Sequence, residues 1–411
     1  MATDAWDVVI IGAGAAGLMA AIRASERGKR VLLLEKNRKP GVKILMSGGT
    51  RCNITHDCDT RGIIEAFGPN GKFLHSALAA FTIKQTIAFF EAEGVATKVE
   101  DTGKIFPVSD KALDVLEALL RKLNRAGATL SLEEPVSELR YADNCFEINT
   151  PKRILTCGQV LLTTGGQSYP GCGTRGDGYR WATQFGHTLI PPKPALVPIT
   201  VAADWLTELR GITLADVNLK VLDGPTTLLA RRGGFLFAHF GLSGPAPLDV
   251  SRAISRHPQP QTLQLELDFL PTSTDAQVDD FLKTEALASG KKQLNVVLSE
   301  RLPRRLCDAL LGHLGQPLDR KATGLSKPER LSLVQAIKHL RLPIRGTLGF
   351  EKAEVTSGGI ALSEVDSKTL QSKLRPGLFL AGEILDLDGF IGGYNFQAAW
   401  STGWLVGNSV G

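Results

Sequence analysis

The chain has 411 residues, of which 43% are hydrophobic and 22% are charged. This is the composition of an ordinary globular protein, and it excludes a disordered chain, a collagen and a coiled coil. The net charge of +5 is too small by itself to indicate a nucleic-acid-binding protein. At roughly 150 residues per domain, the length predicts two or three domains.

The first elements of the chain form one predicted unit. Residues 7–11 (DVVII) are a short apolar run that is typical of a buried strand. Residues 12–17 (GAGAAG) supply a turn, residues 18–27 have a helical pattern, and Gly28 ends that helix. Residues 30–35 (RVLLLE) give a second buried strand. The sequence therefore predicts a βαβ unit closed within about 30 residues.

The turn of this unit carries the G-x-G-x-x-G pattern as Gly12, Gly14 and Gly17. The first glycine allows a tight turn, the second lets the backbone approach a pyrophosphate, and the third lets helix and strand pack closely. The phosphates would lie at the amino terminus of the helix that begins near Ala15. Glu35 follows at the end of the second strand and can accept both hydroxyls of an adenosine ribose. The pattern in this context predicts a dinucleotide cofactor.

The N-terminal apolar run raises the question of a membrane segment, and the cysteines raise the question of a metal site. Residues 8–24 contain a single charge, but the run follows acidic residues and is shorter than the ~20 residues of a membrane span. Cys52, His56 and Cys58 are close in sequence, yet no second pair of ligands follows and no C-x-x-C pair occurs. We therefore expect a cytoplasmic protein with reduced thiols, no membrane segment and no metal site.

Helices and strands alternate in the pattern up to residue 190. Helices are expected at 83–93 and 111–126, and strands at 129–132, 136–141, 145–149 and 159–163. Four prolines between residues 191 and 198 mark a boundary. Short alternating segments then predict an antiparallel sheet or small barrel to about residue 270, and leucine spacing predicts helices from about 274 to 340. A buried strand is expected at 378–381 and a final helix at 398–406.

The C-terminal part of the chain favours FAD over a nicotinamide cofactor. A two-part flavin fold takes its second part from near the C-terminus. Here Gly382 and Glu383 follow the predicted strand 378–381, and an acid at this place suits a ribityl hydroxyl. Residues 392–395 (GGYN) open the final helix, whose amino terminus would stabilise negative charge on the pyrimidine ring of reduced flavin.

A second G-x-G-x-x-G pattern occurs at Gly171, Gly173 and Gly176. Residues 165–170 separate it from the preceding strand, and no acidic residue lies near position 196. This context argues against a dedicated NAD(P) domain. We expect NAD(P)H to visit the flavin transiently as the reductant.

Several unusual motifs follow one another along the chain: 41–53 (GVKILMSGGTRCN), 164–178 (TGGQSYPGCGTRGDG), 194–198 (PALVP), 239–245 (HFGLSGP), 354–359 (EVTSGG) and 377–394 (GLFLAGEILDLDGFIGGY), extended by 395–397 (NFQ). With these motifs the chain resembles the YhiN/BaiN-like flavoproteins, a branch of the two-dinucleotide-binding-fold flavoenzymes, over essentially its whole length. Two positions depart from the family pattern. Thr50 stands where a third glycine is usual, and Leu370 stands where methionine is common.

The resemblance implies an α/β fold in which both chain ends form one Rossmann-like FAD-binding domain. That domain is expected at 1–190 and 351–411, with an inserted barrel-like antiparallel β domain at 191–270 and an inserted basic helical domain at 271–350. The inserted region is expected to cover the substrate face of the flavin. The residues expected to bind FAD are Gly12, Ala13, Gly14, Ala15, Ala16, Gly17, Glu35, Lys36, Lys43, Ser47, Gly48, Arg51, Asn53, Val136, Thr164, Gly165, Gly166, Gly382, Glu383, Gly392, Gly393, Tyr394 and Asn395.

Cys52 is the predicted catalytic residue. Reducing a C=C bond requires a hydride from flavin N5 and a proton on the neighbouring carbon. A thiol beside Arg51 and a glycine-rich backbone can be acidified and can serve as the proton donor. The alternative is a small buried cysteine without a chemical role.

Three functions remain open at this point. The first is an NAD(P)H-driven reductase that converts uridine to dihydrouridine in ribosomal RNA, as the resemblance implies for part of the family. Residues 291–345 contain 12 basic and 4 acidic residues, and this excess of +8 suits a polyanion. The second is a reductase of a small conjugated, enone-like metabolite, and the third is a non-catalytic FAD-binding protein.

Overall fold

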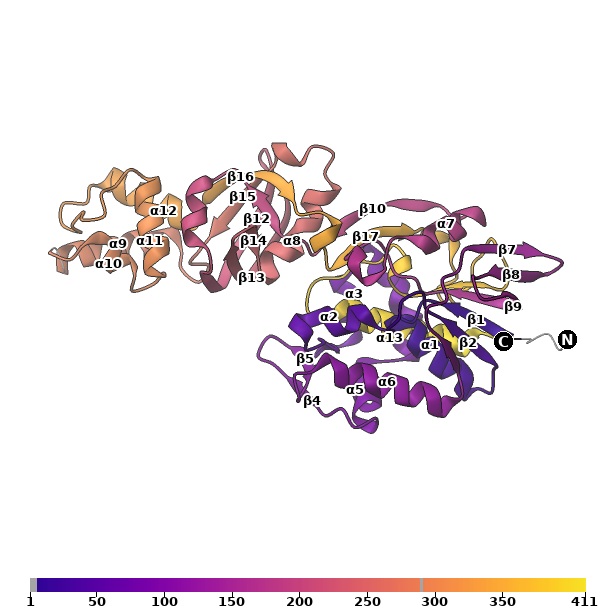
Figure 1. Ribbon diagram of the computed structural model, residues 1–411. Coiled ribbons are helices and arrows are strands. Elements are labelled where there is room, and N and C mark those ends of the chain that lie inside the picture. The colour runs from indigo at the N-terminus through magenta and orange to yellow at the C-terminus, as the bar shows by residue number, and fades with distance from the viewer. Residues whose placement is uncertain (1–5, 289–290) are drawn as a thin grey trace. The chain divides into compact units, whose positions relative to one another are not determined.

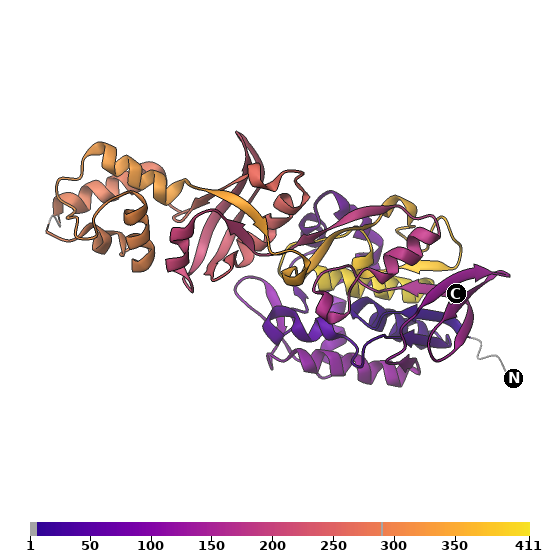
Figure 2. The same cartoon turned by 45° about the horizontal axis from the view of Figure 1, so that its top comes forward.

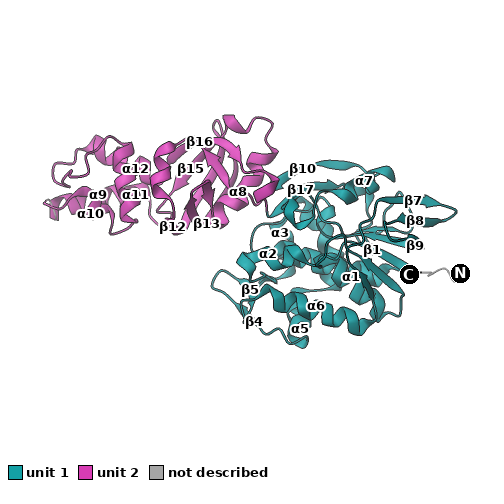
Figure 3. Cartoon of the chain, viewed as in Figure 1, with its two compact units in different colours: residues 1–194, 354–411 teal, residues 195–353 magenta. Residues whose placement is uncertain are grey.

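The computed structural model describes residues 6–288 and 291–411. The chain divides into two compact units (Figure 3). Unit 1 comprises Met1–Pro194 and Glu354–Gly411, and unit 2 comprises Ala195–Ala353. Each unit has a hydrophobic core of its own. The two chain ends therefore fold together in unit 1, and unit 2 is inserted between them.

Unit 1 is built on a seven-stranded sheet (Figure 1). Five strands run parallel, in the order β6-β2-β1-β9-β18: β6 (Thr129–Ser131), β2 (Val31–Leu34), β1 (Trp6–Ile11), β9 (Ile154–Leu162) and β18 (Leu378–Leu380). The amino-terminal half of β9 also pairs antiparallel with β8 (Cys145–Asn149), which pairs with β7 (Glu138–Ala142). The residues of β2 and β18 are all buried, as expected for strands of a parallel sheet that is covered on both faces. The predicted Rossmann-like fold is thus confirmed.

Helices from both chain ends pack together in unit 1. A Cβ atom at Gly403 of α13 (Tyr394–Ser409) would lie 2.3 Å from the carbonyl oxygen of Ala16 in α1 (Ala15–Glu26), so only glycine allows this approach. Arg23 of α1 also donates to the Asn408 side chain at 2.7 Å. The other helices of unit 1 are α2 (Val42–Thr50), α3 (Thr60–Ala66), α4 (His75–Ala80), α5 (Ile83–Ala92), α6 (Ala112–Ala126) and α7 (Asp177–Gln184).

Two small sheets complete unit 1, and the sequence analysis missed both. One has the order β3-β5-β4, from β3 (Thr55–His56), β5 (Lys104–Pro107) and β4 (Thr97–Val99). The other pairs β10 (Leu189–Ala195) with β17 (Val355–Ile360). The prolines of β10 suggested a boundary only, but proline is tolerated in a strand that has a single neighbour.

Unit 2 contains a closed six-stranded barrel. Its order is β11 (Ile199–Val201), β14 (Gly241–Ser243), β13 (Thr226–Ala238), β12 (Thr213–Asp223), β15 (Gln264–Asp268) and β16 (Leu340–Thr347), and β16 pairs with β11. Helix α8 (Pro245–Arg256) packs against β12 and β13. The expected helical segment 271–350 therefore includes the strand that closes the barrel, because β16 returns to the barrel after the helices.

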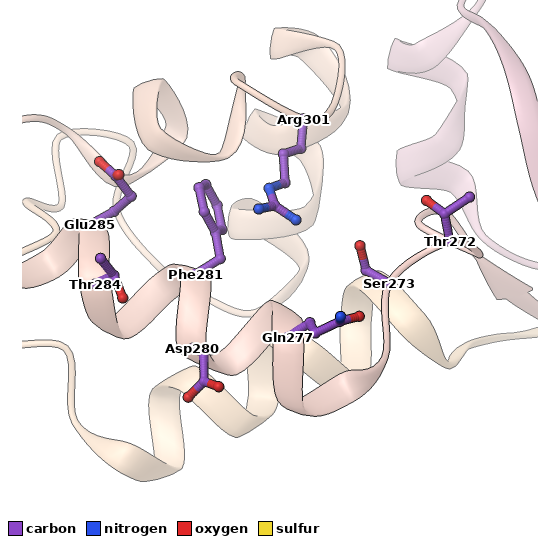
Figure 4. A pocket seen from close by; sticks show the side chains of 8 residues that line it. All are labelled: Thr272, Ser273, Gln277, Asp280, Phe281, Thr284, Glu285 and Arg301. Atoms are coloured by element: carbon purple, nitrogen blue, oxygen red, sulfur yellow. The ribbon is translucent and has the colours of Figure 1, made fainter.

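A group of helices follows β15 and precedes β16 in the chain, and it lies at one end of the barrel (Figure 2). It consists of α9 (Asp275–Ala288), α10 (Leu294–Leu298), α11 (Arg304–His313) and α12 (Lys327–Lys338). An open groove of about 450 Å³ runs beside α9, and in it the Arg301 guanidinium lies 4.1 Å from the centre of the Phe281 ring (Figure 4). Side chains of both charge signs line the groove, and none of the predicted site residues does.

Within the part of the chain that the structure describes, no single helix combines the length and the hydropathy of a membrane span. One pair of segments, Gly68–Ala80 and Ile83–Ala92, meets those criteria only when the two are taken together across a 46° bend.

Candidate functional site

Four of the predicted cofactor-binding segments follow parallel strands at one edge of the large sheet. Strands β1, β2, β9 and β18 are parallel and end at Ile11, Leu34, Leu162 and Leu380. The segments 12–17, 35–36, 164–166 and 382–383 follow these ends within a few residues. Ligands of doubly wound sheets bind outside the carboxyl ends of the strands. Topology therefore brings residues from both ends of the chain to one place, and Val136 follows the end of β6 on the same edge.

The turn after β1 is closely packed at Gly12 and Gly17 but leaves open space beside Gly14. Gly12 has φ +108°, and a Cβ atom at Gly17 would lie 2.0 Å from the Gly12 carbonyl oxygen. A Cβ atom at Gly14, in contrast, would meet no protein atom within 4 Å. Helix α1 begins at Ala15 with no side-chain cap, so the amides of its first turn, including Ala15 and Ala16, are available to an anion.

Glu35 is buried beside this turn. Its two carboxylate oxygens accept hydrogen bonds from the backbone amides of Ala13 and Asn37, each at 2.9 Å. A carboxylate offers about four lone-pair sites, so both oxygens can still accept from a ribose diol. The neighbouring Lys36 instead forms an ion pair with Asp177 at the start of α7. The next residue, Asn37, contacts the loop that carries the second glycine pattern: its side chain donates to the carbonyl oxygen of Cys172 at 3.0 Å, and a Cβ atom at Gly173 would lie 2.7 Å from that side chain.

Four side chains from distant parts of the chain form a hydrogen-bonded network. Lys43 of α2 donates to Glu383 at 2.6 Å and to the Ser168 hydroxyl at 2.7 Å. Ser168 donates to the other oxygen of Glu383 at 2.7 Å, and the backbone amide of Thr356 donates to that oxygen at 2.8 Å. The Thr356 hydroxyl accepts from the backbone amide of Ser168 at 2.9 Å. The network fixes the predicted residues Lys43 and Glu383 together at the sheet edge.

The amino terminus of α13 lies against β3. Gly392 and Gly393 have φ +131° and +94°, and the helix begins at Tyr394 without a side-chain cap. The Asn395 side chain donates to the carbonyl oxygen of Gly389 at 3.0 Å and accepts from the Gly389 amide at 2.8 Å. The Asn395 side chain therefore holds the loop that precedes the helix.

Polar atoms without protein partners lie near both glycine turns. The Asn53 Oδ1 atom is buried and accepts no hydrogen bond, and a Cβ atom at Gly393 would lie 2.8 Å from it. The hydroxyl of Thr164, which follows β9 and precedes Gly165 and Gly166, is also buried without a partner. Unpaired buried polar groups are rare in folded proteins unless a ligand or water satisfies them. Together with the open space at Gly14, these atoms fit a bound dinucleotide such as FAD.

The glycine-rich stretch folds into a strained turn at the end of α2. The backbone leaves the helix at Ser47, and Gly48, Gly49 and Thr50 then have φ +56°, +67° and +71°. Cys52 has φ +61°. Left-handed backbone costs a side-chain-bearing residue roughly 1–2 kcal/mol. Such strain is found mainly at functional sites, and the departure of Thr50 from glycine falls on one of these left-handed positions.

The structure corrects the expectation that Arg51 acidifies Cys52. Arg51 forms ion pairs with Glu100 at 2.6 Å and Asp110 at 3.5 Å, and its guanidinium stacks 3.9 Å from the centre of the Phe106 ring. The Cys52 side chain is completely buried, and this burial raises the pKa of its thiol to about 12. Cys52 is therefore protonated at neutral pH. Its role as a proton donor stays a prediction.

The cysteine cluster does not form a metal site among the described residues, because no group of three or more His, Cys, Asp or Glu side chains has a suitable arrangement. The imidazole of His56 instead contacts Gly392 and Tyr394 at the start of α13. Sequence reasoning placed His56 only in the metal alternative. It also missed Ser168 and Thr356, although both lie in motifs that the resemblance used.

Comparisons with known proteins found a matching family, similar sequences and a similar fold. The HI0933-like protein Rossmann domain family matches residues 6–409. The chain is 35% identical to the "Ribosomal RNA dihydrouridine synthase" of Escherichia coli K12, over 99% of this chain and 98% of that protein. It is 33% identical to the "3-dehydro-bile acid delta(4,6)-reductase" of Clostridium scindens, over 98% of each chain. The 3-ketosteroid-delta4-(5alpha)-dehydrogenase of Rhodococcus jostii RHA1 shares the fold, with a TM-score of 0.50, 16% identity and coverage of 99% and 97%.

Proposed function

Because the chain belongs to the HI0933-like family of FAD-dependent oxidoreductases, we propose that it reduces uridine in ribosomal RNA to dihydrouridine with electrons from NADH or NADPH. One hydride and one proton add across the C5=C6 bond of the uracil ring, and the nicotinamide is oxidised. FAD, when bound, supplies the hydride chemistry between the two substrates.

The observation that carries this proposal is the similarity, along nearly the full length of both chains, to a protein named for that reaction. The test is an incubation of unmodified ribosomal RNA transcript with the FAD-loaded protein and NADPH or NADH. We expect digestion of the RNA to release a nucleoside two hydrogen atoms heavier than uridine. Unchanged RNA, with an enone reduced under the same conditions, would contradict the assignment.

Different residues at the sheet edge would hold different parts of the bound FAD. The Gly14 turn and the first amides of α1 would hold the pyrophosphate, and Glu35 would hold the adenosine ribose. Glu383, fixed by Lys43 and Ser168, would orient the ribityl chain. The amino terminus of α13 would stabilise negative charge that develops on the pyrimidine ring.

We keep the proposal that Cys52 delivers the proton to the substrate carbon, which requires its enclosed thiol to reach the substrate. The Cys52→Ala variant should bind FAD and be reduced by NAD(P)H normally, whereas its reoxidation by substrate should slow by roughly 10²-fold or more. The matched control is Cys58→Ala, which removes a half-buried thiol from the same stretch and should leave both steps unchanged. Stopped-flow absorbance of the flavin separates the two half-reactions. If substrate reoxidises the flavin of Cys52→Ala at the wild-type rate, the thiol takes no part in the mechanism.

The basic segment 291–345 is less available to RNA than its sequence indicates. Acidic residues outside the segment neutralise part of it: Lys338 pairs with Asp268, Arg341 with Glu266 and Arg345 with Asp204. Within the segment Lys292 pairs with Glu300 and Arg304 with Asp308, and Arg305 donates to the backbone of Glu208 and Arg210. This pairing weakens the electrostatic argument for RNA. The second candidate is a small enone-like substrate, such as the name of the Clostridium relative suggests.

Three exposed lysines of the helical group make no ion pair among the described residues: Lys291, Lys321 and Lys327. If this group binds RNA, replacing all three by glutamate should weaken binding to a ribosomal RNA transcript. The slope of the logarithm of the binding constant against the logarithm of the salt concentration should also become shallower, by the equivalent of about three phosphate contacts. Replacing the paired Lys292, Arg304 and Arg345 by glutamate changes the charge equally, is the control, and should flatten the slope less. An unchanged affinity and slope in the first variant would exclude this surface as the RNA contact.

A further inference from the structure

His56 joins the three-stranded small sheet of unit 1, β3-β5-β4, to the last helix. It lies in β3, and its Nδ1 atom is 2.9 Å from the carbonyl oxygen of Gly392. Its ring stacks on that of Tyr394, with 4.6 Å between ring centres and 21° between planes. One imidazole thus contacts both sides of the Gly392–Gly393 turn, directly before α13 begins.

The same turn is packed tightly against the β3 backbone. A Cβ atom at Gly393 would lie 2.5 Å from the carbonyl carbon and oxygen of Thr55. A Cβ atom at Gly392 would lie 3.3 Å from His56 Nδ1. Both glycines have left-handed backbone, which a residue with a side chain rarely adopts. The backbone of β3 packs against the turn, and the imidazole contacts the carbonyl group of Gly392.

The contact defines the chemical form of the imidazole. A carbonyl oxygen only accepts hydrogen bonds, so Nδ1 carries a proton and donates it to Gly392. Burial lowers the pKa of His56, and the nearby Lys104 on β5 lowers it further, whereas the Gly392 contact and Asp57 oppose the shift. The neutral ring with a proton on Nδ1 is therefore the form that holds the turn at pH 7.

We propose that His56 is a positioning residue that fixes the amino terminus of α13 and thereby sets how strongly this helix stabilises negative charge on the bound flavin. The inference rests on the FAD-binding part of the proposed function and not on the RNA substrate. Helix termini act only within about one turn, so a small displacement of the first amides weakens the effect. His56 acts through Gly392 and is not expected to touch the reacting atoms.

The test compares two amide variants of similar polarity. The Asn side chain places its Nδ2 donor where His Nδ1 lies, whereas Gln places its donor one bond farther from the backbone. His56→Asn should therefore preserve the Gly392 contact, and His56→Gln should lose it. His56→Leu removes the donor altogether and shows the effect of losing the Gly392 contact completely.

Sulfite is the probe, because it adds to N5 of oxidised flavin and leaves negative charge on the pyrimidine ring. We expect His56→Gln and His56→Leu to weaken sulfite binding about tenfold, with His56→Asn within about threefold of the wild type. The FAD dissociation constant and the thermal unfolding of each FAD-free variant are measured alongside. A role limited to folding would change unfolding without this Asn-over-Gln order.

The outcomes separate this inference from the rest of the account. Equal sulfite affinity in wild type, His56→Gln and His56→Leu would overturn it, as would a loss in His56→Asn as large as in His56→Gln. If His56→Leu does not fold, the Asn and Gln pair still decides. A wild-type protein that binds no FAD would instead refute the cofactor assignment itself.

Discussion

The Gly14→Ala variant is expected to fold with wild-type stability and to bind FAD about a hundredfold more weakly, whereas Gly17→Ala is expected to lose both stability and FAD. The two glycines belong to the same turn, but their surroundings differ. A Cβ atom at Gly14 meets no protein atom within 4 Å, and its φ of −83° suits alanine. The methyl group would enter the space in which we expect the pyrophosphate to approach the backbone.

At Gly17 the new methyl group would collide with the protein itself. The Cβ atom would lie 2.0 Å from the Gly12 carbonyl oxygen and 2.6 Å from the Thr163 hydroxyl, so helix and strand must separate. Overpacking of this kind costs roughly 1–3 kcal/mol, and more where backbone has to move. Chemical unfolding of the FAD-free proteins and titration with FAD measure the two effects. Tight FAD binding by Gly14→Ala would show that the pyrophosphate lies elsewhere.

A second large effect is expected in unit 2, from the buried Lys338. Its ammonium group donates to Asp268 and to the carbonyl oxygen of Leu270, each at 2.7 Å, and only 5% of its side chain is exposed. Asp268→Ala leaves this charge without its counter-ion. We expect a loss of about 3 kcal/mol in the free energy of unfolding, because a buried charge without a partner is costly.

The control for Asp268→Ala is Arg345→Ala, which breaks an ion pair whose partner Asp204 is 92% exposed. Its expected cost is about 0.5 kcal/mol or less. The double variant Lys338→Met with Asp268→Ala removes both charges and should recover part of the loss. Urea unfolding followed by circular dichroism measures all three. Equal losses in Asp268→Ala and Arg345→Ala would show that Lys338 does not depend on this carboxylate.

The sequence correctly predicted the elements that depend on residues close together in the chain. The βαβ unit with Gly12, Gly17 and Glu35 follows from apolar runs and glycine spacing within about 30 residues. The C-terminal strand and the glycines that precede the last helix were also predictable, since each is a continuous motif. These segments supply the two halves of the candidate cofactor site.

Contacts between distant segments could not be predicted in the same way. Lys43 and Glu383 are separated by 340 positions, and nothing in either motif shows that the two side chains share a hydrogen bond. The closure of the barrel by β16 depends on strand pairing across the inserted helices. The ion pairs of the basic segment could not be predicted for the same reason, because its counter-ions Asp204, Glu266 and Asp268 lie outside it.

The environment of Cys52 shows a second limit of sequence reasoning. Arg51 precedes it in the chain, and that adjacency suggested a lowered thiol pKa. In the structure the arginine is held by Glu100 and Asp110, while the thiol is enclosed by the core of unit 1. Burial therefore dominates, and it raises the pKa instead.

The most direct test of the proposed function is an anaerobic mixing experiment. The FAD-loaded protein is first reduced with NADPH or NADH, and unmodified ribosomal RNA transcript is then added in the absence of oxygen. We predict that the visible flavin absorbance is lost in the first step and returns in the second, as uridine absorbance falls. Flavin that stays reduced with RNA, but is reoxidised by a conjugated enone, would contradict the RNA assignment and favour the small-molecule substrate.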